Sequence, residues 1–230
     1  SSLKNLEILF PTPFNKPLDK ESTFKIKSTL SFERDNLEVE VNYKDILRGK
    51  IFLGEEKPKG FITLNQQTYK GDLPVDKLII TGTLDSVDPF EYSSFSASEN
   101  QLFNKDLLVI KDLQIKNILL GLTVLKNTSL DMERIGQASN FYLLNEELKG
   151  SFFLPDRLEK GVKIDLDYLR LTKFNKERDN LFPSLLSQLK FPLMFSTADL
   201  ELDDHNLGSW KFVLTSDMKS LKFDDIEGRY

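Results

Sequence analysis

The stretch Leu37-Glu38-Val39-Glu40-Val41 decides the fold, because apolar and charged side chains alternate in it without a break. Successive side chains of a β-strand point to opposite faces, so this spacing predicts a strand with one apolar and one charged face. The same period of two recurs in Phe24-Lys25-Ile26-Lys27, Ile164-Asp165-Leu166-Asp167 and Leu200-Glu201-Leu202-Asp203, and less strictly in residues 77–84, 107–118 and 211–214. The chain is therefore expected to form a β-sheet whose charged face is exposed to solvent.

Short turn sequences separate these strands. Residues that tolerate tight or left-handed backbone occur in Arg34-Asp35-Asn36, Arg48-Gly49, Lys70-Gly71-Asp72, Lys126-Asn127 and Asp203-Asp204-His205-Asn206. Strands joined in this way pair mostly antiparallel, as a meander. Helical patterns are scarce: residues 178–190 carry leucines four residues apart, and residues 90–95 fit a single turn. The sequence thus predicts an all-β, mainly antiparallel fold with one or two short helices.

A proline-rich segment, residues 9–17, precedes the first predicted strand. Proline has no N–H to give to a ladder, so Pro11, Pro13 and Pro17 exclude a helix or a central strand here. The segment is expected to run along an edge or corner of the sheet, with Phe10 and Phe14 anchoring it against an apolar surface.

Weak internal similarity suggests a repeat. Residues 112–121 and 199–208 each contain an Asp-Leu-x-Ile/Leu strand that leads to a Leu-Gly pair. This pattern predicts two weak sub-repeats, residues 1–106 and 107–230. Because the sequence has no initiating Met and stops directly after strand-like residues, residues 1–230 are expected to be a piece of a larger repeating β domain.

Composition excludes several classes of protein. The 230 residues have a net charge of -5 and no run of Lys or Arg stands out, which argues against a general nucleic-acid binder. The absence of cysteine excludes disulfides and thiolate metal sites. No apolar run approaches the roughly 20 residues that span a bilayer as a helix.

Residues with catalytic chemistry do not form a recognisable site. The single histidine, His205, lies in a turn, where histidine is usually solvated, and the pairs Asp203-Asp204 and Asp224-Asp225 point apart in a strand or into water in a turn. No phosphate loop, nucleophile elbow or zinc motif occurs. A carbohydrate enzyme is a distant alternative, and we expect no catalytic residues, no metal and no cofactor.

The apolar strand faces allow two interpretations. They can seal against each other as the core of a β-sandwich, giving a non-catalytic scaffold or protein-binding module, or they can line an open, curved groove. Periodicity does not separate the two, but 18 Phe, among them Phe52 and Phe61, with few helices to cover a sheet, favour the groove. The candidate lining residues are Phe10, Phe14, Phe24, Ile26, Val39, Val41, Ile164, Leu166, Leu200 and Leu202.

Several motifs resemble one family. Residues 10–17, followed by an alternating strand, resemble the Pro-x-Pro-Leu-x-Lys segment of the YhdP branch of the AsmA-like, TamB-related bacterial envelope proteins. Residues 150–155 and the strand of residues 162–171 are similar to that family's Gly-x-hydrophobic-x-x-Pro motif and the strand after it. Leu207-Gly208-Ser209-Trp210 and Ile226-Glu227-Gly228 match its late strands, whereas Phe14 stands where the family usually has Leu and Tyr168 where it often has Arg.

The resemblance implies an elongated, twisted, curved β-sheet that forms an apolar groove in the periplasm, as in bridge-like lipid transfer proteins. It implies phospholipid transport between the inner and outer membranes, in support of the outer-membrane permeability barrier. The implied partners are phospholipid acyl chains, the inner membrane through a transmembrane helix outside this sequence, and the outer membrane or its proteins. No catalytic residue, cofactor or nucleic acid comes with the resemblance.

Overall fold

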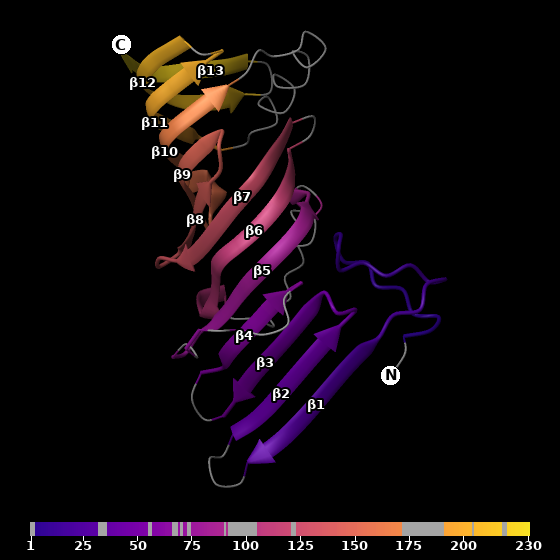
Figure 1. Ribbon diagram of the computed structural model, residues 1–230. Coiled ribbons are helices and arrows are strands. Elements are labelled where there is room, and N and C mark those ends of the chain that lie inside the picture. Colours follow the sequence, from indigo (N-terminus) through magenta and orange to yellow (C-terminus); the bar gives the residue numbers. More distant parts are fainter. Residues whose placement is uncertain are drawn as a thin grey trace. The chain divides into compact units, whose positions relative to one another are not determined.

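The computed structural model describes residues 3–31, 36–54, 57–65, 69, 71–72, 75–89, 91, 105–120, 123–171, 191–203, 205–217 and 220–230. Strands dominate these residues (Figure 1): β1 (Phe24–Ser31), β2 (Asn36–Tyr43), β3 (Leu47–Leu53), β4 (Lys59–Leu64), β5 (Leu78–Val87), β6 (Leu108–Leu120), β7 (Thr123–Arg134), β8 (Ala138–Leu144), β9 (Leu148–Pro155), β10 (Val162–Leu171), β11 (Leu193–Leu202), β12 (His205–Asp217) and β13 (Ser220–Arg229). Two 3-10 turns, η1 (Lys105–Leu107) and η2 (Leu158–Lys160), precede β6 and β10. The all-β prediction is confirmed. The helix predicted at residues 178–190 lies outside the described residues, as does the turn at 90–95 except for Glu91.

The strands are hydrogen-bonded in the order of the sequence, from β1 to β13, and form one sheet that does not close on itself. Most of the pairs with a defined register are antiparallel, as predicted, but β4 with β5, β5 with β6 and β10 with β11 are parallel. These pairs follow the long connections of residues 65–77, 88–107 and 172–192. A parallel neighbour requires such a connection, because the chain must return to the end where the first strand began. The predicted meander is therefore interrupted at these three places.

Glycines and bulges bend the sheet. The ladders β5–β6, β9–β10, β11–β12 and β12–β13 each contain a shift of register, and bulges of this kind increase strand twist. At Gly82 (φ 125°) a Cβ atom would lie 2.1 Å from the Leu64 carbonyl oxygen, and at Gly150 (φ 155°) it would lie 2.4 Å from that of Asp165. Only glycine permits this close approach of neighbouring strands.

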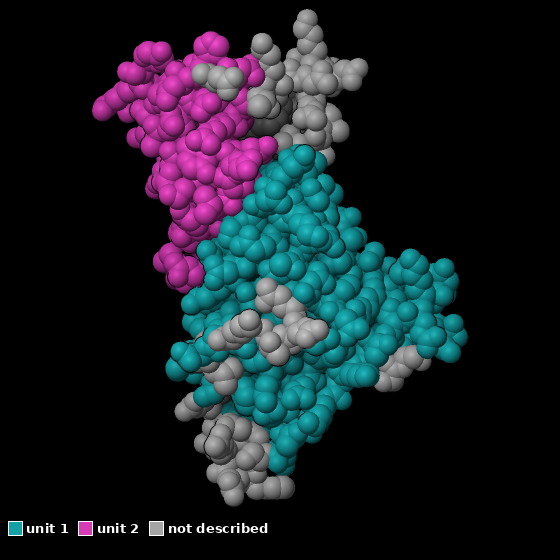
Figure 2. All heavy atoms as spheres, viewed as in Figure 1, with its two compact units in different colours: residues 1–131 teal, residues 132–230 magenta. Residues whose placement is uncertain are grey.

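The chain forms two compact units, residues 1–131 and 132–230 (Figure 2). The buried apolar side chains of the first unit include Leu64, Leu84 and Ile115, and those of the second include Leu166 and Leu214. This division falls within β7, whereas the predicted sub-repeats meet at residue 106; the sub-repeats stay a prediction.

The proline-rich segment adds no strand to the sheet. Its backbone makes one isolated bridge, in which the amides of Ile8 and Lys16 donate to each other's carbonyl oxygens at 2.9 Å. The Lys16 side chain is only 1% exposed, and its ammonium group donates to the carbonyl oxygens of Leu6 and Pro17 at 2.6 and 3.1 Å. The segment is thus a small hairpin that its own buried lysine holds together.

Candidate functional site: an apolar face in each unit

The strand register gives the first unit one continuous apolar face. Phe24 pairs with Tyr43 and Ile26 with Val41, so these side chains point to the same side of β1 and β2. Following the ladders from β1 to β6 adds, on this same side, Leu30, Leu37, Val39, Leu47, Ile51, Leu53, Ile62, Leu64, Leu78, Ile80, Leu84, Leu108, Ile110, Leu113 and Ile115. We call this set the first apolar face. It contains four of the candidate lining residues: Phe24, Ile26, Val39 and Val41.

The opposite side of β1, β2 and β3 carries charged side chains, whereas on β4 and β5 the same side carries the apolar Phe61 and Ile79. Lys27, Glu40 and Lys50 stand side by side across β1, β2 and β3, with N–O distances of 3.8 and 3.9 Å between neighbours. Lys50 also contacts Glu38 at 2.6 Å. Ion pairs of this kind, between exposed or half-exposed side chains, keep this side hydrated and contribute little stability.

The second unit repeats the arrangement with larger side chains. Register places Phe141, Phe152, Ile164, Phe195 and Phe212 next to one another in a line that crosses β8 to β12. We call this line the aromatic row. The Phe195 and Phe212 rings stack with centroids 4.8 Å apart, and the ring of Phe223 on β13 meets Phe212 edge-on at 5.5 Å.

The remaining candidate residues lie beside the aromatic row. Leu166 follows Ile164 by two residues and points to the same side, where it is 4% exposed. The bulge between Leu166 and Tyr168 keeps Leu169 on this side, so its partner Leu200, and then Leu202, share it. Leu214 follows Phe212 by two residues and pairs with Phe223, so both point to this side as well. We call these residues and the aromatic row together the second apolar face.

Both apolar faces are partly open to solvent. Some side chains are buried, such as Leu214 at 2% exposure, whereas Ile26, Leu30 and Phe223 are 59, 56 and 48% exposed. In the described residues all strands belong to one sheet. Large apolar surfaces that remain open in this way mark binding sites.

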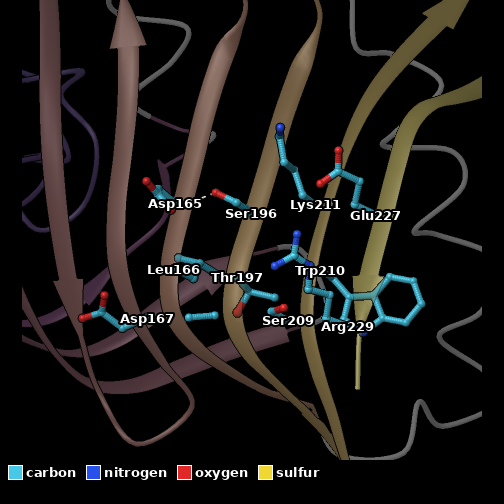
Figure 3. Close-up of a pocket in the computed structure, with 11 residues that line it drawn as sticks. Asp165, Leu166, Asp167, Ser196, Thr197, Ser209, Trp210, Lys211, Glu227 and Arg229 are labelled. Carbon is cyan, nitrogen blue, oxygen red and sulfur yellow. Dashed lines mark hydrogen bonds between the residues drawn. The ribbon is translucent and has the colours of Figure 1, made fainter.

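The charged side of the second unit carries a shallow hollow of about 360 Å³ over β10 to β13 (Figure 3). Asp165, Ser196, Lys211 and Glu227 line it, together with Arg229. The Ser196 hydroxyl donates to the Asp165 carboxylate at 2.8 Å and lowers the pKa of that group, with help from Lys163 and against the effect of burial. Leu166 and Trp210 also line this hollow, so its lining combines charged, polar and apolar side chains.

Phe10 and Phe14 stand apart from the strands. Phe14 is half-buried and its carbonyl oxygen accepts a hydrogen bond from the Tyr43 hydroxyl at 3.2 Å, whereas Phe10 is 55% exposed. The sequence correctly indicates that they lie outside the ladder. Their role as lining residues stays a prediction.

Two phenylalanines that favoured the groove lie on the other side. Phe52 and Phe61 pair with Glu38 and Lys50, and so belong to the charged side of the first unit. Tyr69, from the connection after β4, stacks on Phe61 at 4.9 Å. The alternation of residues along β3 and β4 predicts that Phe52 and Phe61 lie on this side. The total number of phenylalanines does not show on which side of the sheet they lie.

Within the ranges that the structure describes, the residues with possible catalytic chemistry form no cluster, and Asp204 lies outside those ranges. His205 is exposed, with Nδ1 2.9 Å from the Asp203 carbonyl oxygen. Among the described residues no group of three or more His, Cys, Asp or Glu side chains could hold a metal ion. No helix of the described part is long and apolar enough to cross a membrane.

The geometry defines a class of protein: an open β-sheet whose units are each apolar on one side and charged on the other. No family model, curated protein or solved structure matches the chain.

Proposed function

We propose that the chain carries the acyl chains of phospholipids along its apolar faces. One observation supports this proposal most: each unit keeps an unbroken apolar face that is partly open, although its other side is charged. Single exposed apolar side chains are common in folded proteins, but Ile26, Leu30 and Phe223 each belong to a larger apolar face, and exposed apolar patches are typical of binding surfaces.

The energetics fit transport better than tight storage. Burial of one methylene contributes about 0.8 kcal/mol, so water opposes the exposure of a sixteen-carbon chain by on the order of 10 kcal/mol. An apolar lining removes most of this barrier. Because the contacts are not directional, a chain can slide along the aromatic row with little change in energy.

The setting we propose follows from the resemblance of residues 10–17, 150–155 and 162–171 to the YhdP branch of AsmA-like envelope proteins. The chain would lie in the periplasm as part of a protein anchored in the inner membrane by a helix outside this sequence. It would pass phospholipids between the inner and outer membranes and support the permeability barrier. No catalytic step is needed, since the lipid is moved without being changed.

A binding or scaffold module of the cell envelope is the alternative, in which a protein segment covers the apolar faces. Native mass spectrometry of the chain, purified from a Gram-negative host in a mild detergent, distinguishes the two. We expect added masses equal to those of phospholipids, released by organic solvent. A chain free of lipid, which also takes up none from phosphatidylethanolamine vesicles, would contradict lipid transport.

A further inference from the structure

The proline-rich hairpin, residues 8–16, connects two distant places in the first unit. Near β2, the Tyr43 hydroxyl donates to the Phe14 carbonyl oxygen at 3.2 Å and the Lys44 ammonium group donates to that of Asn15. At its other side, the Thr12 amide donates to Oε2 of Glu91 at 3.2 Å, four residues beyond the end of β5. β3 and β4 lie between β2 and β5 in the sheet, so these contacts connect the end of β2 with a residue that follows β5.

The hairpin lies on the apolar side of the sheet. Tyr43 belongs to the first apolar face, so the carbonyl group that its hydroxyl contacts is on that side. β2, β4 and β5 all run toward this end, where Tyr43, Leu64 and Leu84 are only 7, 4 and 4% exposed. At the opposite end Leu30 and Leu53 of the same face are 56 and 37% exposed.

The attachment of the hairpin differs from that of a strand. Internally it is braced by the bridge between Ile8 and Lys16 and by the buried Lys16 ammonium group. Its described contacts with Tyr43, Lys44 and Glu91 each use a side chain, not a ladder of backbone hydrogen bonds. A segment attached by a few side-chain contacts opens at a lower free energy than strands held in a ladder.

We propose that residues 8–16 are a movable strap that closes the first apolar face at the Tyr43 end of the strands and controls the sideways entry of hydrocarbon. The control of lipid entry rests on the proposed function; the covering of the face does not.

The covering is tested with Leu64→Cys, since the chain has no cysteine of its own. The rate at which a maleimide dye labels this thiol is compared with and without the pair Tyr43→Phe and Lys44→Met, which removes two strap contacts. Each lost hydrogen bond changes an opening equilibrium by about fivefold, so we expect labelling to be about 25-fold faster. Leu30→Cys, at the open end, is the control and should label at the same rate in both backgrounds.

An unchanged rate at Leu64→Cys, or an equal rise at Leu30→Cys, would overturn the strap. For lipid entry, Thr12→Cys and Glu91→Cys are joined by a short bis-maleimide, and the uptake of a pyrene-labelled fatty acid is followed. We expect uptake at this unit to slow relative to the two single variants. Faster labelling of Leu64→Cys with no fatty-acid uptake in any variant would support the strap and contradict the proposed function.

Discussion

Replacement of Val39 by Asp tests whether the first apolar face binds hydrocarbon. Val39 lies in the middle of β2, half-buried, with Ile51 of β3 beside it on the same face. Asp at this position places a hydrated carboxylate in the path of a bound acyl chain, because the register fixes the direction of the side chain.

The expected loss follows from the strand spacing. Strands lie about 4.8 Å apart, so a chain that crosses β2 lays about four methylenes over this position. At about 0.8 kcal/mol for each methylene, exposing them to water costs about 3 kcal/mol, or a loss of about 150-fold in affinity. The assay is the displacement of a bound fluorescent fatty acid by unlabelled palmitate.

Asn42→Asp is the matched control. It adds the same charge to the same strand but points to the charged side, opposite Lys25 and Arg48. We expect its affinity to stay within about twofold of the parent, since favourable surface charge pairs contribute little. Equal losses in the two variants, or no loss in either, would refute the assignment of the apolar face as the binding surface.

Three further predictions concern stability. Arg134→Met removes the two-point ion pair with Asp156 (2.9 and 2.7 Å) from a side chain that is 7% exposed, and should lower the free energy of unfolding by about 1–3 kcal/mol in chemical denaturation. Gly82→Ala should destabilise the protein by at least about 2 kcal/mol and speed amide exchange in β4 and β5, because its Cβ would collide with a carbonyl oxygen 2.1 Å away; unchanged exchange would contradict the close approach. The lowered pKa of Asp165 means that its ionised form stabilises the fold above the unfolded-state pKa of about 3.9 and that this contribution is lost as the pH falls through the folded pKa. Ser196→Ala should raise the pKa of Asp165 in an NMR titration, and no change would show that the hydroxyl is not the cause.

The sequence predicts well which side chains share a face of the sheet, because successive residues of a β-strand point to opposite sides. Alternation in residues 37–41 is sufficient to place Val39 and Val41 together, and the structure pairs them with β1 on that same face. A bulge follows Leu166, and it places Leu169 on the same face of the sheet as Leu166. The apolar face therefore continues across the bulge. The direction of each side chain therefore follows from the sequence alone, without knowledge of the order of the strands.

Other features leave no signal in the sequence. The parallel pairing of β10 with β11 depends on the connection formed by residues 172–192. The alternation of residues within each strand does not predict whether the two strands run parallel or antiparallel. The burial of Lys16 is equally hidden: lysine is ordinarily exposed, and only the carbonyl groups of Leu6 and Pro17 make its position favourable. Contacts between residues far apart in the chain decide both cases.

The alternating charges of Lys27, Glu40 and Lys50 limit how copies of this chain can associate. Cross-β fibrils form when both faces of a sheet pack against other sheets and exclude water. Desolvation of the charged side chains in this ladder carries a large free-energy penalty, which opposes such packing. In the first unit, the charged ladder therefore leaves the opposite, apolar face as the side through which copies can associate. We predict that a ligand bound to this face would also reduce self-association of the chain.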